Sequence, residues 1–155
     1  MIRKALLALA LVLALIAIAK HGKVFPLGKS APNAASAISY AEAQLGKPYS
    51  WGATGPDAFD CSGLIYRAYR LPWSDRTSQE QWANLPHVAS SVPGDLVYFT
   101  GLLNPGEQPP GHVGLVIGAH LMIDAYGGSI GVVRQSFGLP DSPQGLTDPL
   151  GYTSP

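Results

Sequence analysis

The sequence predicts an α+β protein in which N-terminal helices pack on an antiparallel sheet. Between residues 33 and 85 the apolar residues recur at helical spacing, whereas between residues 96 and 134 they alternate with a period of two. Turn signals such as Pro93-Gly94 separate the short strands expected in the second half. Helices that come before the strands, rather than alternating with them, are typical of this fold class.

The length and charge of the chain limit the kinds of protein that it can be. Its 155 residues leave room for one domain, and 46% of them are hydrophobic, which is enough to form a core. Ten basic and ten acidic residues give no net charge, which argues against a nucleic-acid-binding module. The single cysteine excludes an internal disulfide and zinc sites built on several cysteines.

The N-terminal segment has the pattern of an export signal. Fifteen apolar residues, 5–19, follow Arg3 and Lys4, and Ala17-Ile18-Ala19 offers a cleavage site. Retention of residues 5–19 as a membrane anchor is an alternative, although at about 1.5 Å per residue the run is shorter than the roughly 30 Å hydrocarbon core. A buried core helix is a third interpretation. A signal or an anchor would place the following linker, residues 20–32, and the domain at 33–155 outside the cytoplasm.

The first two helices are predicted from their caps and their apolar stripes. Asn33 caps a helix to about Leu45, where Gly46 stops it, and its stripe is formed by Ala34, Ile38, Ala41 and Leu45. Asp60 caps a second helix over residues 61–70. The loop between the helices is rich in glycine, proline and aromatic residues.

A third helix and four strands follow. Residues 77–80 have the capping-box pattern, so a helix is expected from Ser78 to about Leu85. The segments that read as strands are Leu96 to Thr100, His112 to Ile117, Leu121 to Tyr126 and Gly131 to Arg134. The Pro- and Gly-rich chain beyond Phe137 is expected to wrap the surface.

Cys61 lies at the first turn of the second helix, on the stripe formed by Leu64, Ile65, Ala68 and Tyr69. One interpretation is a small core hydrophobe. The other is a nucleophile, because a helix N-terminus favours thiolate and the preceding aromatic loop fits a cleft better than a core wall. In the same region Tyr49 and Trp51 can equally be core aromatics, and Arg76 can be a solvated charge before a helix.

The predicted hairpin places a histidine beside a carboxylate. A three-residue loop centred on Gly118 pairs Val116 with His120, and the same register pairs His112 with Asp124. Cross-strand side chains stand roughly 5 Å apart, so the carboxylate can fix the histidine tautomer and stabilise imidazolium. A solvated surface pair is the alternative interpretation. His120 falls at the tip of the hairpin, and the sequence suggests no partner for His21 or His87.

In combination, these segments resemble the NlpC/P60 family of cell-wall cysteine peptidases. The resemblance covers roughly residues 34–135 and is carried by GKPYSWGATGPDAFDCSG at 46–63, Arg76-Thr77-Ser78, PGDLVYF at 93–99 and HVG at 112–114. It implies a circularly permuted papain-like fold, with residues 33–155 as the catalytic domain. It also implies cleavage of peptidoglycan stem peptides after D-isoglutamate, by a monomer that needs neither a metal nor an organic cofactor.

The resemblance assigns roles residue by residue. Cys61 is the expected nucleophile, His112 the general base and Asp124 the third triad member, where many relatives have a second histidine. Tyr49 matches a tyrosine of the oxyanion site. Two further matches, expected to help hold the substrate, flank the nucleophile: Asp60 and Ser62.

Two other functions fit the same residues. A papain-like amidase or acyltransferase can use the same cysteine and histidine, because one scaffold supports several acyl-transfer reactions. A non-catalytic, membrane-anchored wall-binding protein is the third possibility. The presence of Cys61, His112 and Asp124 together argues against it, because a protein that only binds has no need of all three.

Overall fold

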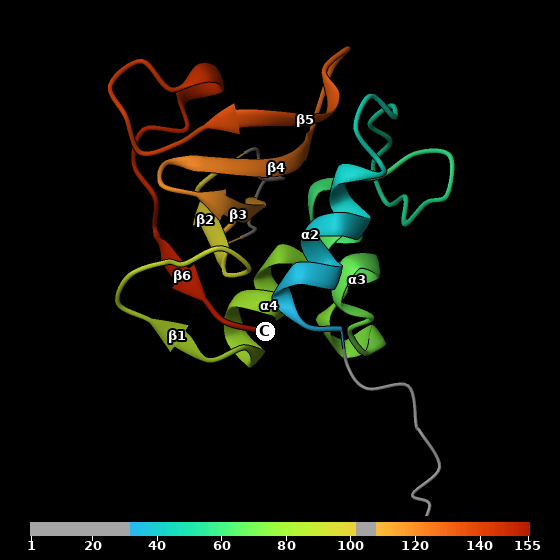
Figure 1. Ribbon diagram of the computed structural model, residues 1–155, viewed down its shortest axis with the longest axis horizontal. Helices are drawn as coiled ribbons and strands as arrows, with labels where there is room; N and C mark the ends of the chain where they lie inside the picture. The colour runs from blue at the N-terminus through green and yellow to red at the C-terminus, as the bar shows by residue number, and fades with distance from the viewer. Residues whose placement is uncertain (1–31, 102–107) are drawn as a thin grey trace, which may run out of the picture. The chain divides into compact units, whose positions relative to one another are not determined.

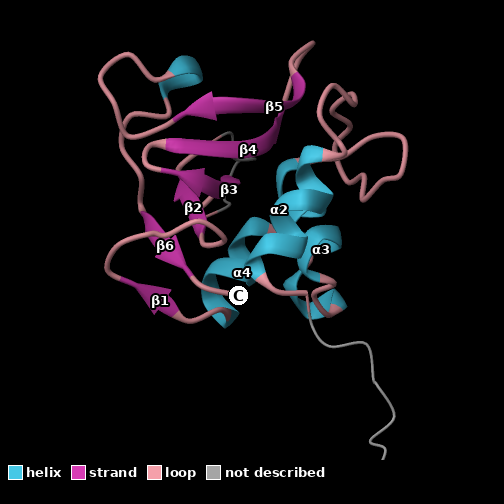
Figure 2. Ribbon diagram, in the orientation of Figure 1, coloured by secondary structure: helices cyan, strands magenta, loops and turns pink. Residues whose placement is uncertain are grey.

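The computed structural model describes residues 32–101 and 108–155. The predicted export segment, residues 5–19, lies outside the described residues, as does nearly all of the predicted linker. Three α-helices pack against a six-stranded sheet, as Figures 1 and 2 show, which confirms the predicted α+β class. All strand pairs are antiparallel and their order across the sheet is β1-β6-β2-β3-β4-β5.

The helices begin where their caps predict. They are α2 (Ala34–Glu42), α3 (Cys61–Tyr69) and α4 (Ser78–Asn84). The side chain of Asn33 accepts from the Ser36 N–H, and Thr77 and Glu80 form the complete capping box. A short 3₁₀ turn, Trp73–Asp75, connects α3 to α4.

The predicted stripe of α2 is wrong in part. Ala37 and Ala41 are fully buried, whereas Ala34 is exposed and Leu45 is 36% exposed. The fully buried residues of the helix are these two alanines, so the buried stripe contains fewer residues than the predicted one. The helix also ends three residues early, because the chain turns until Gly46 donates its N–H to the Val132 carbonyl at 2.8 Å.

The four predicted strands are β2 (Leu96–Phe99), β3 (His112–Gly118), β4 (Leu121–Tyr126) and β5 (Gly131–Ser136). On the helix side, Leu64 and Ile65 of α3 belong to one core cluster with Leu115 of β3 and Ile123 of β4. A second cluster lies on the other face of the sheet. It contains strand residues that alternate with those of the first cluster, together with Phe137 and Leu146 from the C-terminal part of the chain.

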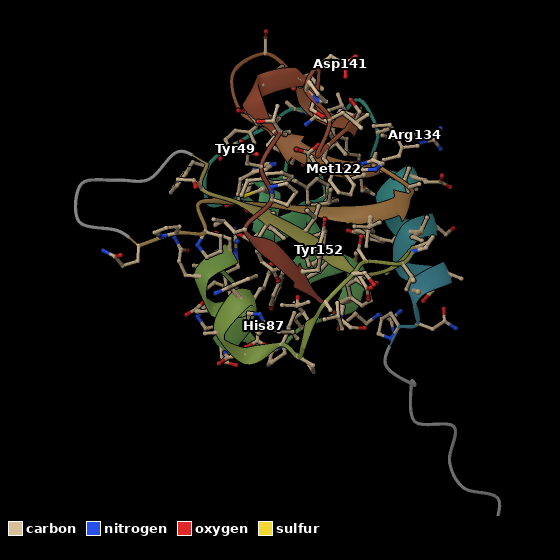
Figure 3. All side chains as sticks on the ribbon, turned by 90° about the vertical axis from the view of Figure 1, so that its left-hand side faces the viewer. Tyr49, His87, Met122, Arg134, Asp141 and Tyr152 are labelled. Atoms are coloured by element: carbon tan, nitrogen blue, oxygen red, sulfur yellow. The ribbon has the colours of Figure 1, made fainter. Side chains whose placement is uncertain are left out.

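Two strands were not predicted. The chain beyond Phe137 does contribute to the surface, as predicted. It also forms β6 (Gly151–Thr153), which pairs with β2 and with β1 (His87–Val88). Neither segment has the length or the alternation that signals a strand, and both depend on partners far away in the sequence. His87, which is labelled in Figure 3, therefore lies in a strand rather than in a loop. Its Nε2 is 2.9 Å from the Trp82 carbonyl.

The predicted register of the hairpin is wrong by two residues. Val116 lies opposite Met122, not opposite His120, and Leu115 lies opposite Ile123. A register shift between Val116 and Gly118 extends β3, so the turn contains only two residues. Because a shift of two keeps every side chain on its face of the sheet, His112 and Asp124 still share a face, but as diagonal neighbours.

Candidate active site

Cys61 is the first residue of α3 and is 8% exposed. The Asp60 carboxylate caps this helix by accepting from the Gly63 N–H at 2.6 Å. A Cβ on Gly63 would lie 2.1 Å from the Ala53 carbonyl oxygen, so only glycine lets the preceding loop approach the helix this closely. Leu64 and Ile65, both fully buried, anchor the helix in the core. The fold thereby fixes the position of the thiol.

Asp60 also connects the loop to α4. Its Oδ2 accepts from the Gly52 N–H and from Arg76, each at 2.8 Å. Arg76 donates a second hydrogen bond, of 2.9 Å, to Ser62 Oγ. The interpretation of Arg76 as a solvated charge is therefore wrong, because this buried side chain neutralises the carboxylate beside the nucleophile.

His112 and Asp124 form a buried pair. The His112 Nε2 lies 2.6 Å from Asp124 Oδ2, and Asp124 is completely buried. The alternative of a solvated surface pair is thereby excluded. Gln135 on β5 donates from Nε2 to both carboxylate oxygens at 2.8 Å. Asp124 thus receives hydrogen bonds from both neighbouring strands.

The surroundings of His112 favour its charged form. Burial lowers its pKa, but hydrogen bonds with the Asp124 carboxylate and the Cys61 sulfur, and the negative charges of both groups, raise the pKa to about 10. An imidazolium hydrogen-bonded to a cysteine sulfur is the pairing that cysteine nucleophiles use. The arrangement therefore places a proton donor beside the thiol.

Tyr49 is brought close to the nucleophile by a backbone bridge to Phe59, which lies two residues before Cys61. Burial, followed by the nearby negative charges of Cys61 and Asp60, raises the pKa of Tyr49 to about 12. The phenol therefore stays protonated and remains a hydrogen-bond donor at neutral pH. Tyr49 and Cys61 line the same pocket, which brings a neutral donor to the side of the nucleophile.

The pocket has a volume of about 270 Å³ and is lined by Tyr49, Trp51, Gly52, Asp60, Cys61, Ser62, Trp73, Arg76, Thr77, Ser78, Gln79 and Gly111. Trp51 is 66% exposed and Trp73 is 72% exposed, so Trp51 is a residue of the pocket rather than of the core. Of the six predicted site residues, Tyr49, Asp60, Cys61 and Ser62 line the pocket directly. The other two, His112 and Asp124, extend from Cys61 into the sheet.

Within residues 32–101 and 108–155, no other histidine has a buried carboxylate and a cysteine beside it. His120, which lies in the hairpin turn, is exposed, and its Nδ1 is 3.1 Å from the Phe137 carbonyl. Within the described ranges, no three His, Cys, Asp or Glu residues are grouped so as to hold a metal ion. In the same part of the chain, every helix is too short or too polar to cross a membrane.

Sequence reasoning did not assign a role to two residues of this network. Arg76 had a usable signal, because it lies in one of the motifs that carry the family resemblance. Gln135 had almost none, because it comes one residue after the end of the predicted strand, Gly131 to Arg134, and belongs to β5 only in the structure. Only the observed register of β4 and β5, with Met122 opposite Gln135, brings its amide to Asp124.

Known proteins share both the sequence and the fold of this region. The chain is similar to the probable endopeptidase p60 of Listeria grayi, with 43% identity over 100 residues that cover 60% of this chain and 18% of that protein. It is 38% identical over 102 residues to the probable peptidoglycan endopeptidase LytE of Bacillus subtilis, covering 64% of this chain and 29% of the relative. The chain thus spans less than a third of the length of either protein.

A solved structure gives the same result. The crystal structure of an NlpC/P60 family protein from Bacillus cereus matches with a TM-score of 0.64 and 28% identity, over 79% of this chain and 40% of that chain. The sequence pattern that describes the NlpC/P60 family matches residues 46–139. Since these residues are more than half of the chain and include Cys61, His112 and Asp124, the chain belongs to the NlpC/P60 family.

Proposed function

We propose that the chain is a cysteine peptidase that hydrolyses peptide bonds in peptidoglycan. The observation that carries this proposal is the buried His112–Asp124 pair in contact with Cys61, at a pocket of about 270 Å³. The names of the relatives, endopeptidase p60 and peptidoglycan endopeptidase LytE, supply the substrate class. We assign the same substrate class to this chain because it belongs to the same family and has a nucleophile, a base and a third polar residue.

The mechanism follows from the protonation states. The Cys61 thiolate attacks the carbonyl carbon of the scissile amide, and the oxyanion accepts hydrogen bonds from the Cys61 backbone N–H and the Tyr49 hydroxyl. The His112 imidazolium then gives its proton to the leaving amine, and a thioester remains. Neutral His112 takes a proton from water, the hydroxide attacks the thioester, and the carboxylic acid product leaves as the thiolate re-forms.

The proposal also includes the bond that is cleaved and the residues that contact the substrate. We assign the cut to the bond between D-isoglutamate and the third, diamino residue of the stem, which is what the family resemblance implies. Asp60 and Ser62 would contact the substrate at the pocket wall, where their carboxylate and hydroxyl oxygens can accept hydrogen bonds from an amine. A stem with a free N-terminal amine is then preferred over a stem that is still attached to glycan.

The placement of the protein follows from its substrate. We propose that residues 33–155 form the catalytic domain and act as a monomer outside the cytoplasm. Residues 5–19 would serve as the export signal or as a retained anchor. The pattern of Arg3 and Lys4 before fifteen apolar residues supports both options, and the mass of the mature protein distinguishes them.

Mass spectrometry of purified muropeptides after incubation with the chain tests the function. The expected products carry a new amino terminus on the diamino residue, and free tripeptide or tetrapeptide stems react faster than glycan-linked stems. The matched control is Cys61→Ala, which should fold and release nothing. Cuts at the sugar–peptide amide would assign the chain to the amidase alternative. Binding to the wall without any product would indicate a non-catalytic protein.

A further inference from the structure

Gln135 is the one side chain from β5 that is hydrogen-bonded to the Asp124 carboxylate in the described residues. It lies opposite Met122 in the register of β4 and β5, two residues from Asp124 along β4 and on the same face. The amide therefore reaches Asp124 diagonally, across a separation that suits a long side chain. Asp124 is fully buried and Gln135 is 8% exposed, so water has little access to this contact.

His112 reaches the same carboxylate from the other neighbouring strand. Extending the pairing of Leu115 with Ile123 by one residue places Gly114 opposite Asp124, and His112 two residues further along β3. A Cβ on Gly114 would lie 2.4 Å from Met122 Sδ and 3.5 Å from Asp124 Cβ, so the close packing here leaves no room for a side chain on β3. Asp124 is consequently held between two diagonal partners, one on each side.

The chemistry of the two contacts is complementary. The amide nitrogen of Gln135 can only donate, so it holds the two acceptor oxygens of Asp124 in a fixed orientation. The titratable groups around the carboxylate are His112 from β3, with Cys61 of α3 beyond it, and Tyr126 from β4 itself. In the described residues, Gln135 is the uncharged side chain that donates to this carboxylate, whereas the Tyr126 hydroxyl donates to the Gln144 carbonyl.

We propose that Gln135 is a positioning residue that keeps the Asp124 carboxylate aimed at His112. It acts through Asp124 and does not contact the substrate. This inference rests on the proposed function, in which His112 cycles between imidazolium and imidazole. Loss of the amide would leave the Asp124 carboxylate free to turn, and the imidazolium would lose part of its stabilisation.

The first test compares Gln135→Met with Gln44→Met. Both glutamines are 8% exposed, but the Gln44 side chain bonds, among the described residues, to the Tyr40 carbonyl and to Lys47, away from the triad. Hydrogen bonds to charged groups have the strength to change a rate by about 10-fold or more. We expect Gln135→Met to lower kcat by about that factor with little change in KM, and Gln44→Met to leave both unchanged even if its thermal stability falls.

The second test uses Gln135→Glu, which keeps the length and polarity of the side chain. At low pH the new carboxyl group is protonated and can donate to Asp124 as the amide does. Its ionisation at higher pH places two carboxylates together, which repel each other. The kcat of this variant should be near that of the wild type at about pH 5 and fall as the pH rises towards about 8, where the wild type remains active. This profile decides the question if Gln135→Met does not fold.

An NMR titration of the His112 imidazole gives a readout that needs no substrate. We expect its midpoint to move to lower pH in Gln135→Met and to stay in place in Gln44→Met. A folded Gln135→Met protein with wild-type kcat and an unchanged His112 titration would overturn the inference, as would a Gln135→Glu profile identical to that of the wild type. If the wild type cleaves no stem peptide, the proposed function fails, while the titration still tests the role of Gln135.

Discussion

One or two neighbouring side chains set the charge of each reacting group in the site. Asp124 and Cys61 together hold the pKa of His112 at about 10, against the opposing effect of burial. The alternation of the hairpin predicted that Asp124 shares a face with His112, whereas the partnership of Cys61 with His112 followed from the family resemblance. The sequence did not predict that Arg76 neutralises Asp60 at 2.8 Å, since sixteen residues separate the two and no local periodicity connects them.

Asp124→Asn should reduce turnover far more than stability. Asparagine can still accept a hydrogen bond, but it cannot neutralise the imidazolium and can select the wrong tautomer. A loss of roughly 10²- to 10⁴-fold in kcat is expected from steady-state kinetics on a stem peptide. The control is His120→Ala in the exposed turn, which should be nearly silent. If His120→Ala lost its activity while Asp124→Asn kept it, the assignment of Asp124 to the triad would be wrong.

Tyr49→Phe tests the oxyanion site. The substitution removes one hydroxyl from a residue whose pKa is raised to about 12 and which therefore stays a donor across the working pH range. Loss of one oxyanion donor typically lowers kcat by roughly 10²-fold or more. We expect KM and the melting temperature to change little. An unchanged kcat would mean that the phenol does not face the developing charge.

The helices and the strands β2 to β5 follow from local signals, whereas β1 and β6 do not. Caps at Asn33, Asp60 and Thr77 give the starts of all three helices, because capping needs only the neighbouring residues. The hairpin register was missed because an irregularity between Val116 and Gly118 changes the turn without leaving a clear mark in the sequence. The pairing of β6 has no local cause at all.

Gly63→Ala should disturb the contact between α3 and the loop before it. The added methyl group would lie 2.1 Å from a backbone oxygen, so the loop that carries Tyr49 has to move. We expect a loss of roughly 1–3 kcal/mol in the free energy of unfolding, measured with urea, together with lower activity. Gly118→Ala is the matched control, because the nearest atom to its new Cβ is 3.8 Å away. Equal effects of both substitutions would contradict the close-approach argument.

The stability of the whole domain should depend on pH through His112. Its pKa rises from 6.5 to about 10 on folding, so the stabilisation is complete below about pH 6.5 and is lost as the pH rises through about 10. The free energy of unfolding should therefore fall between pH 7 and 9.5, below the range in which tyrosines begin to ionise. Urea titrations of the wild type and of Asp124→Asn measure this, and the variant should show the shallower fall. A flat wild-type profile would contradict the raised pKa.

The position of β6 has a consequence for the order in which the domain is completed. Tyr98 on β2 bonds to Thr153 at 2.9 Å, across 55 residues of chain. During synthesis from the N-terminus, the β2 edge stays without this partner until residue 153 has emerged, although the triad residues are already made. An open strand edge is a template for wrong pairing between chains. The interval between residues 99 and 153 is therefore when a growing chain is most open to aggregation, and a pause in translation there would prolong it.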